Sequence, residues 1–262
     1  MIARDPWQSF ARHTPARIAL GRTGASLPTE EVLRFSLAHA QARDAVHMPF
    51  DAARVESEIR ALGFDTLRVE SAAPARDIYL RRPDLGRRLS DESRARLAAL
   101  DALDAPPADL AIVVADGLSA AAIHAQTAPF LAALKPWIEK EGWSVAPVAL
   151  AAQARVALGD EVGELMKARA LVVLVGERPG LSSPDSLGLY LTLAPRVGRT
   201  DAERNCISNV RAEGLSHPLA AFKLAWHIRE ALRLGLTGVG LKDESDLLLV
   251  DGAPPAALPR PT

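Results

Sequence analysis

One segment of the sequence, residues 172–206, joins a strand-like apolar run to side chains that could do chemistry. The run VVLVG is followed directly by Glu177 and Arg178, and the segment ends at Cys206, the only cysteine among 262 residues. In open α/β sheets, ligands bind in the crevice beyond the carboxyl ends of the strands. A carboxylate and a guanidinium placed there can accept and donate hydrogen bonds to a polar ligand. The turn that follows this run is therefore the first candidate for a binding site.

Several common catalytic and cofactor patterns do not occur in the sequence. The turns lack both G-x-G-x-x-G and GxxxxGK[ST], the phosphate-binding loops of nucleotide folds. The six histidines form neither HExxH nor a pair with CxxC, which argues against a metal site. No serine lies in a G-x-S-x-G elbow, and Cys206 lacks the flanking residues of a cysteine hydrolase. From these residues alone, Cys206 is expected to be a small buried residue beside a turn.

The composition is that of a globular protein with balanced charge. Hydrophobic residues make up 48% and charged residues 24% of the chain, and the net charge of −1 gives no electrostatic case for nucleic acid or an anionic membrane. The single cysteine excludes an intrachain disulfide and fits a reducing compartment. No apolar run reaches the ~20 residues of a membrane helix, and the N-terminus has no signal-peptide core. We therefore expect a cytoplasmic protein.

The elements that would position the candidate site fall into two regions, of which the first is residues 1–104. This region has a mainly helical pattern and is expected to form a smaller N-terminal domain. N-cap residues, acidic first turns and apolar periodicity predict helices over 29–46, over 52–62 and from Ser90 onward. Short strands or extended loops are expected over 65–71 and 77–80.

The second region, residues 105–250, alternates between apolar runs and helical patterns. Strands are predicted over 110–115, 144–150, 171–177 and 189–194, and helices over 120–142, 156–168 and 216–235. Strands rich in Val, Leu and Ile with helices between them indicate an α/β fold, a Rossmann-like parallel sheet domain with helices on both faces. Residues 251–262 form a proline-rich tail that is expected to be loose.

A series of motifs in a fixed order gives the chain a family resemblance. They are RIALGRTGASLPTEEVLRFSLAHAQARDAV, YLRRPDLGRRL, VVADGLSAAAI, RVALGDEVGE, GERPGLSSPDSLG, RNCISNVR and GVGLK, and together they span roughly residues 14–242. In these motifs the chain resembles the small subunit of ethanolamine ammonia-lyase, an adenosylcobalamin-dependent enzyme. Several separate motifs in one order are far more specific than any single short pattern.

The resemblance implies a cobalamin contact surface on this chain, at its junction with a large barrel subunit. The contact residues of the family fall on Val156, Glu177 and Cys206. Val156 would give an apolar wall, Glu177 would accept hydrogen bonds from cofactor amides or ribose hydroxyls, and Cys206 would leave room for the ligand. An ion pair with Arg178 or another arginine is the alternative role for Glu177.

Other polar residues of these loops are further candidates for the same crevice: Arg178, Ser182, Asp185, Ser186, Asn205 and Asn209. The chain lacks D-x-H-x-x-G, the motif whose histidine replaces the cofactor's own base on cobalt. Adenosylcobalamin is therefore expected to bind base-on, with its cobalt held by the cofactor and with no metal ligand from the protein.

The resemblance also implies the reaction, a lyase conversion of ethanolamine to acetaldehyde and ammonia. Homolysis of the cobalt–carbon bond would start the radical chemistry, while the protein supplies binding and orientation. The substrate would be bound mainly by the large subunit. No catalytic residue is therefore assigned to this chain, and the isolated chain is expected to be inactive.

The implied partners are the large subunit and a higher-order hetero-oligomer built around it. The helical N-terminal region, with its arginine cluster at residues 81–88, is a candidate docking surface, and the family suggests a location inside a bacterial microcompartment. Two alternatives remain open. One is a non-catalytic scaffold of the same fold that does not bind the cofactor, which a cobalamin-binding test would reveal. The other is a self-sufficient α/β hydrolase or transferase, which activity of the isolated chain would favour.

Overall fold

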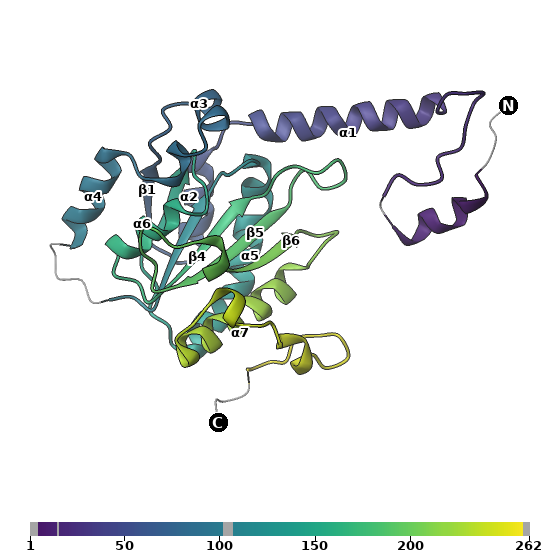
Figure 1. The fold of residues 1–262 in the computed structure, drawn as a ribbon. Helices are drawn as coiled ribbons and strands as arrows, with labels where there is room; N and C mark the ends of the chain where they lie inside the picture. Colours follow the sequence, from purple (N-terminus) through teal and green to yellow (C-terminus); the bar gives the residue numbers. More distant parts are fainter. Residues whose placement is uncertain (1–4, 15, 102–106, 259–262) are drawn as a thin grey trace.

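The computed structural model describes residues 5–14, 16–101 and 107–258, and its centre is a six-stranded mixed sheet (Figure 1). The order across the sheet is β1-β3-β2-β4-β5-β6. The strands are β1 (Thr66–Glu70), β2 (Leu110–Ala115), β3 (Val148–Ala152), β4 (Ala170–Gly176), β5 (Leu187–Leu193) and β6 (Asn205–Val210).

Helices cover both faces of the sheet, as the alternating sequence pattern predicted. One face carries α2, α5 and α7 around a core that includes Ile59, Phe130 and Phe222. The other carries α4 and α6 over Val113 and Val173. The α/β fold class is thus confirmed. The helices are α1 (Thr29–His47), α2 (Ala52–Ala61), α3 (Arg76–Arg81), α4 (Asp91–Asp101), α5 (Ala120–Glu141), α6 (Leu158–Leu165) and α7 (His217–Leu234), and short 3-10 helices cover Pro6–His13, Leu85–Arg87, Asp201–Glu203, Gly238–Gly240 and Ser245–Leu248.

The prediction of a parallel sheet needs a correction, because only four neighbouring strands are parallel. Strands β1, β3, β2 and β4 run in one direction, whereas β5 is antiparallel to β4 and β6 is antiparallel to β5. The cause is the connection 177–186, which contains no helix. A parallel neighbour needs a crossover of about a dozen residues or more, so a short loop returns the chain antiparallel.

Three local predictions differ from the structure, and in the first the strand expected over 144–150 is β3 over Val148–Ala152. Residues 77–80 lie in α3 rather than in a strand or loop, and the buried Tyr79 of this helix donates its hydroxyl to the Ala154 carbonyl at 3.2 Å. A helix of 6 residues is too short to show its periodicity, so this tertiary contact decides. Strand β6 was not predicted, because half of its residues are polar and its burial does not alternate.

The first region of the chain contributes to the sheet. The segment 65–71 contains β1, and β1 pairs with β3 from Thr66↔Val148 to Glu70↔Ala152. The edge strand of the sheet therefore comes from the region expected to be mainly helical. The division into 1–104, 105–250 and 251–262 stays a prediction.

Helix α1 extends away from the sheet, and the N-terminal segment lies beyond it (Figure 1). Of its side chains, Ala38 and Ala45 are buried, whereas Val32, Leu33 and Leu37 are 47%, 64% and 61% exposed. An exposed apolar helix face of this kind is typical of a surface that packs against something else. None of the helices in the described ranges combines the length and apolar character that crossing a membrane requires.

Candidate functional site

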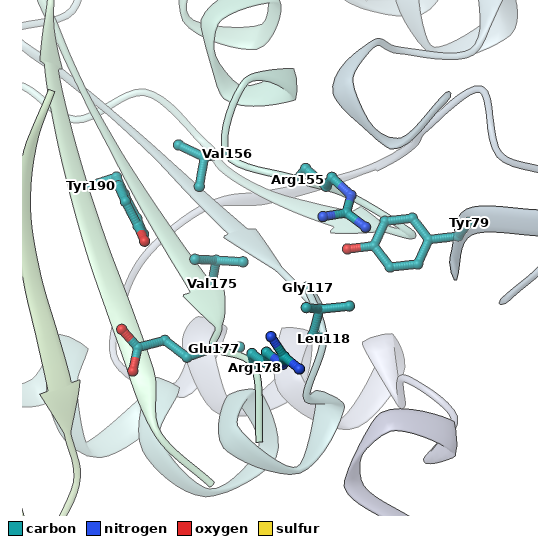
Figure 2. A pocket seen from close by; sticks show the side chains of 10 residues that line it. Tyr79, Gly117, Leu118, Arg155, Val156, Val175, Glu177, Arg178 and Tyr190 are labelled. Carbon is teal, nitrogen blue, oxygen red and sulfur yellow. The ribbon is translucent and has the colours of Figure 1, made fainter. Parts of the chain in front are cut away.

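A cavity of about 410 Å³ opens at the carboxyl ends of β2, β3 and β4 (Figure 2). After β2 the chain enters α5 on one face of the sheet, and after β3 it enters α6 on the other. Loops that leave neighbouring parallel strands in opposite directions open a crevice, and ligands of α/β proteins bind there. The lining residues are Tyr79, Gly117, Leu118, Arg155, Val156, Val175, Gly176, Glu177, Arg178 and Tyr190.

Two glycines bring the strand ends together at the base of this cavity. A Cβ on Gly176 would lie 2.0 Å from the Ser119 carbonyl oxygen, and a Cβ on Gly117 would lie 2.3 Å from the Gly176 oxygen. The Leu118 amide donates to that same Gly176 oxygen at 2.9 Å. Backbone therefore packs directly on backbone here, and only glycine allows the approach.

Glu177 lies at the end of β4, as predicted, and its carboxylate crosses to the neighbouring strands. The Ser186 hydroxyl donates a hydrogen bond to Oε2, and the backbone N–H of Asn209 donates to the same oxygen at 3.3 Å. Gly188 leaves space for it, because a Cβ there would lie 2.9 Å from Oε1. In the described chain its recorded partners are a hydroxyl and a backbone amide rather than an arginine, and Oε1 keeps its capacity to accept a hydrogen bond.

Cys206 lies next to the cavity on β6, paired in register with the lining residue Tyr190 of β5. The prediction of a buried cysteine beside a turn is wrong, because this residue is exposed on an edge strand. Desolvation of the thiol against the sheet still raises its pKa, and a side-chain hydrogen bond with Tyr190 opposes that rise. Burial likewise raises the pKa of Tyr190.

A stacked group of arginine and tyrosine forms the opposite wall. The guanidinium carbons of Arg76 and Arg155 each lie 5.0 Å from the centre of the Tyr79 ring, within cation–π distance. Burial raises the pKa of Tyr79 to about 12, so the ring stays neutral. Gly86 makes room for it, because a Cβ there would lie 2.6 Å from the ring.

The predicted site residues thus fall into two sets. Val156, Glu177 and Arg178 line the cavity, and Cys206 lies on the adjoining strand. Ser186 and Asn209 contact Glu177 and hold its carboxylate.

The remaining candidates lie outside the cavity lining. Ser182 is exposed in the turn before β5, and the Asp185 carboxylate accepts a hydrogen bond from the Gln126 amide at 3.1 Å. The Asn205 amide donates to the Leu241 carbonyl at 2.8 Å and accepts from the Gly238 amide at 2.8 Å. Asn205 begins β6, at the end of the strand far from Glu177, so its contacts hold the C-terminal segment.

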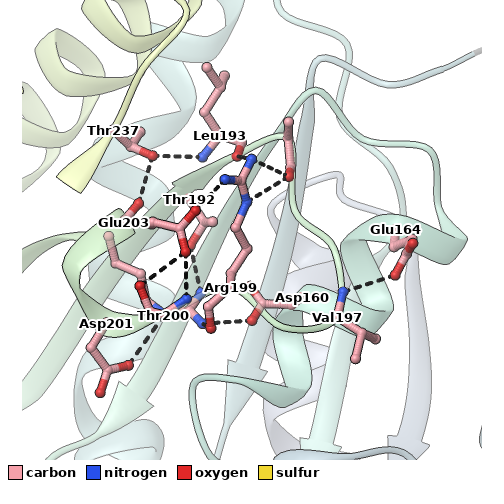
Figure 3. A network of polar contacts seen from close by, with 12 residues as sticks. Asp160, Glu164, Thr192, Leu193, Val197, Arg199, Thr200, Asp201, Glu203 and Thr237 are labelled. Atoms are coloured by element: carbon pink, nitrogen blue, oxygen red, sulfur yellow. Dashed lines mark hydrogen bonds and ion pairs between the residues drawn. The ribbon is translucent and has the colours of Figure 1, made fainter. Parts of the chain in front are cut away.

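A buried polar network beside the cavity joins α6 to β6 (Figure 3). Arg204 donates to both carboxylate oxygens of Asp160 at 2.6 Å, and to the Thr192 hydroxyl at 2.9 Å. Both charged side chains are 2% exposed. A capping box between Thr200 and Glu203 orders the turn that leads into Arg204.

Sequence reasoning missed the lining residues that come from other elements, among them Tyr79, Leu118, Arg155 and Tyr190. Tyr79 and Arg155 do lie in motifs that carried the family resemblance, and Leu118 follows a predicted strand end. Strand-end position was therefore a usable signal for Leu118. No local signal could place Tyr79, which reaches the site from a short helix far earlier in the chain.

Comparison with known proteins gives consistent matches over nearly the whole chain. The family model of the ethanolamine ammonia-lyase light chain (EutC) matches residues 4–242. The ethanolamine ammonia-lyase small subunit of Azotobacter vinelandii is 59% identical over 249 residues, 95% of this chain and 92% of that protein. The small subunit of Xanthomonas campestris is 59% identical over 256 residues, 97% and 94% of the two chains. That of Pseudomonas aeruginosa is 58% identical over 253 residues, 97% and 93%. The chain therefore belongs to the family of ethanolamine ammonia-lyase small subunits.

Proposed function

We propose that this chain forms part of the adenosylcobalamin site in an ethanolamine ammonia-lyase complex. The observation that carries the proposal is the cavity at the carboxyl ends of β2, β3 and β4, because Val156 and Glu177 both line it. These two residues are separated in sequence, yet the family resemblance assigned the same ligand to both. Cys206 borders the same cavity through its pairing with Tyr190.

The size and chemistry of the cavity fit part of such a cofactor. A volume of about 410 Å³ is in the range that holds a drug-sized ligand, and a corrinoid with its nucleotide tail is much larger. The remainder would be covered by the large subunit, as expected for a shared site. The lining supplies an acceptor at Glu177, an apolar wall at Val156, and the Arg155 Nε–H, a buried donor without a hydrogen-bond partner among the described residues. Cofactor amides, methyl groups and phosphate would match these groups.

In this proposal the cofactor supplies radical chemistry that starts the conversion of ethanolamine to acetaldehyde and ammonia. The residues of this chain bind and orient it. Glu177 accepts hydrogen bonds through Oε1, Val156 packs against an apolar part, and Cys206 keeps the neighbouring strand surface free of bulk. The base-on binding mode follows from the absence of D-x-H-x-x-G. No acid or base is assigned here, so the isolated chain is expected to be inactive.

The exposed face of α1 is the surface we assign to the large subunit. Val32, Leu33 and Leu37 are all more than 40% exposed on a helix that extends from the body of the protein. Large apolar side chains in such a position indicate a surface that is covered in an assembly. The higher-order oligomer and the microcompartment location stay predictions.

Reconstitution tests the proposed function. The chain is mixed with its large subunit, ethanolamine and adenosylcobalamin, and acetaldehyde is measured together with equilibrium binding of cyanocobalamin. We expect turnover only in the complete mixture, and loss of both cobalamin binding and turnover in Cys206→Trp combined with Glu177→Gln. Arg196→Gln, an exposed arginine on the β5–β6 connection, is the control.

Each contrary outcome has a clear meaning. Turnover by this chain alone would overturn its role as a dependent subunit and favour a self-sufficient enzyme. Assembly with the large subunit without cobalamin binding would favour a scaffold that does not hold the cofactor. If the double variant binds cobalamin as the wild-type protein does, Glu177 and Cys206 do not contribute to cobalamin contact.

A further inference from the structure

Arg155 lines the cavity, and no carboxylate in the described part of the chain forms an ion pair with it. Its guanidinium lies over the Tyr79 ring at 5.0 Å, and its Nε atom is buried without a hydrogen-bond partner in the part of the chain that the structure describes. A buried donor that makes no hydrogen bond destabilises the fold by the cost of its desolvation. Native proteins leave few buried donors unpaired, so the Nε atom of a cavity-lining arginine calls for an explanation such as a water, an ion or a functional role.

The neighbouring Arg76 shows what a structural arginine looks like in the same cluster. Its Nη1 donates to the Asp116 carboxylate at 3.1 Å and to the Gly117 carbonyl at 2.8 Å, and its Nε donates to the Val46 carbonyl at 2.8 Å. The ion pair with Asp116 neutralises Arg76, although its Nη2 atom, like Nε of Arg155, is buried without a hydrogen-bond partner in the described chain. Arg155 shares the aromatic contact with Tyr79 but has no such ion pair recorded within the described ranges.

A second arginine reaches the same space from the end of β4. Arg178 lines the cavity, is exposed, and has no ion pair recorded in the described chain. Figure 2 shows both guanidinium groups on the side of the cavity near Tyr79 and Leu118, while the Glu177 carboxylate lies on the other side near Tyr190. The cavity is thus positive at one end and negative at the other. Arginine in this setting favours phosphate, which its planar fork binds through two parallel hydrogen bonds.

We infer that Arg155 and Arg178 form a subsite for the phosphodiester in the nucleotide tail of cobalamin. The inference rests on the proposed function and adds to it, because it states which part of the cofactor enters the cavity. The tail carries the only negative charge among groups that are otherwise neutral amides and hydroxyls. Glu177, at the opposite end, would repel that charge and accept hydrogen bonds from the neutral amides instead.

Two corrinoids that differ by one group test this subsite. Cobinamide phosphate carries a phosphate ester that cobinamide lacks, and neither has the ribose or the base. Their binding to the complex of this chain with its large subunit is measured by equilibrium dialysis and by the change in corrin absorbance. We expect the complex to prefer cobinamide phosphate by about tenfold or more, as a charge-assisted contact would give.

Variants assign that preference to residues. Arg155→Gln and Arg178→Gln are each expected to reduce the preference towards equality and to weaken cyanocobalamin binding by about tenfold. Arg155→Lys should restore part of the preference, and Arg196→Gln should keep all of it. Arg178 is exposed, so its variant decides the matter even if Arg155→Gln disturbs the fold.

The outcomes separate the two proposals. A complex that binds no cobalamin would overturn the proposed function, and the subsite with it. A complex that binds cobalamin but gives equal affinities for the two cobinamides would overturn the phosphate subsite alone. Retention of both the phosphate preference and the cyanocobalamin affinity in Arg155→Gln and Arg178→Gln would also overturn it.

Discussion

The buried ion pair between Asp160 and Arg204 connects the two stretches of chain that carry Val156 and Cys206. Asp160 follows Val156 within the first turn of α6, and Arg204 comes just before the start of β6. The two N–O distances are 2.6 Å. Because both side chains are buried, this pair fixes the spacing between α6 and β6, and with it the edge of the cavity near Tyr190.

Removal of one partner of this pair should destabilise the protein strongly. We expect Arg204→Ala to lower the free energy of unfolding by about 3–5 kcal/mol, because it leaves the Asp160 carboxylate buried and unpaired. Urea unfolding followed by circular dichroism measures the change. Arg82→Ala removes one partner of the exposed pair with Asp84 and should change little. Equal effects of the two substitutions would contradict a structural role for the buried pair.

A methyl group on Gly176 should disturb the base of the cavity. The new Cβ would lie 2.0 Å from the Ser119 carbonyl oxygen, and backbone atoms on both sides cannot move independently. We expect Gly176→Ala to cost about 1–3 kcal/mol in unfolding free energy, as other overpacked sites do, and to weaken cobalamin binding by the complex. Gly240→Ala is the control, because its nearest neighbour would be an ordinary 3.6 Å away. A fully stable Gly176→Ala would show that the strand ends can separate.

The reactivity of Cys206 reports on its neighbours. Desolvation is the largest cause that raises the thiol pKa, the charge of Glu177 raises it further, and the hydrogen bond with Tyr190 lowers it. The thiolate is the reactive form, so iodoacetamide should modify the wild-type protein slowly at pH 8. Glu177→Gln should speed the reaction and Tyr190→Phe should slow it. Cys206 is the only cysteine, so mass spectrometry follows it directly. Shifts in the same direction for both variants would contradict this account.

The carboxyl group of Asp116 should make stability depend on pH. Burial raises its pKa from 3.8 to about 6, against the opposing effect of Arg76 and backbone amides. The folded state therefore keeps a proton that the unfolded chain has released, and the stability that this protonation contributes is present below about pH 4 and lost as the pH rises through about 6. The wild-type protein should lose stability relative to Asp116→Asn over this window. A constant difference in urea unfolding from pH 4 to 7 would contradict the shifted pKa.

Polar substitutions on the exposed apolar face of α1 should weaken assembly with the large subunit but leave folding intact. Leu33→Ser and Leu37→Ser together should leave the urea unfolding of the isolated chain nearly unchanged, because both side chains are more than 60% exposed. They should weaken the complex with the large subunit, as measured by analytical ultracentrifugation. Ala38→Ser on the same helix replaces a buried residue and should give the reverse pattern. If the double variant assembles like the wild-type protein, the large subunit does not dock on this face of α1.

The sequence predicted the location of the cavity well because one rule governs it. Glu177 and Arg178 follow a buried strand, and the ends of parallel strands meet at one edge of a sheet. Val156 was placed by the family resemblance, and the structure puts it on the loop between β3 and α6, two strands away from β4 in the sheet. Strand direction was harder, because it depends on what the connection 177–186 does rather than on the strand residues themselves.

The parts that could not be predicted depend on contacts between distant segments. Tyr79 enters the cavity wall from a helix whose position is fixed by a hydrogen bond to Ala154 and by the space over Gly86. The difference between Arg76 and Arg155 depends on Asp116, which only the folded chain brings next to one of them. Residue type cannot distinguish two arginines that differ only in their neighbours.

The position of β1 at the edge of the sheet has a consequence for synthesis of the protein. Among the described strands it pairs with β3 alone, and residues 148–152 leave the ribosome long after residues 66–70. The first strand to be made must therefore wait with an open edge until the third has been made, and pairing over such a sequence distance is slow. Helix α3 follows β1 directly and supplies Tyr79, whose hydrogen-bond acceptor Ala154 follows β3, so this wall of the cavity cannot form before β3 has been made. Because β4 is made after β3, the nascent chain can place Tyr79 before it has made the strand end that carries Glu177.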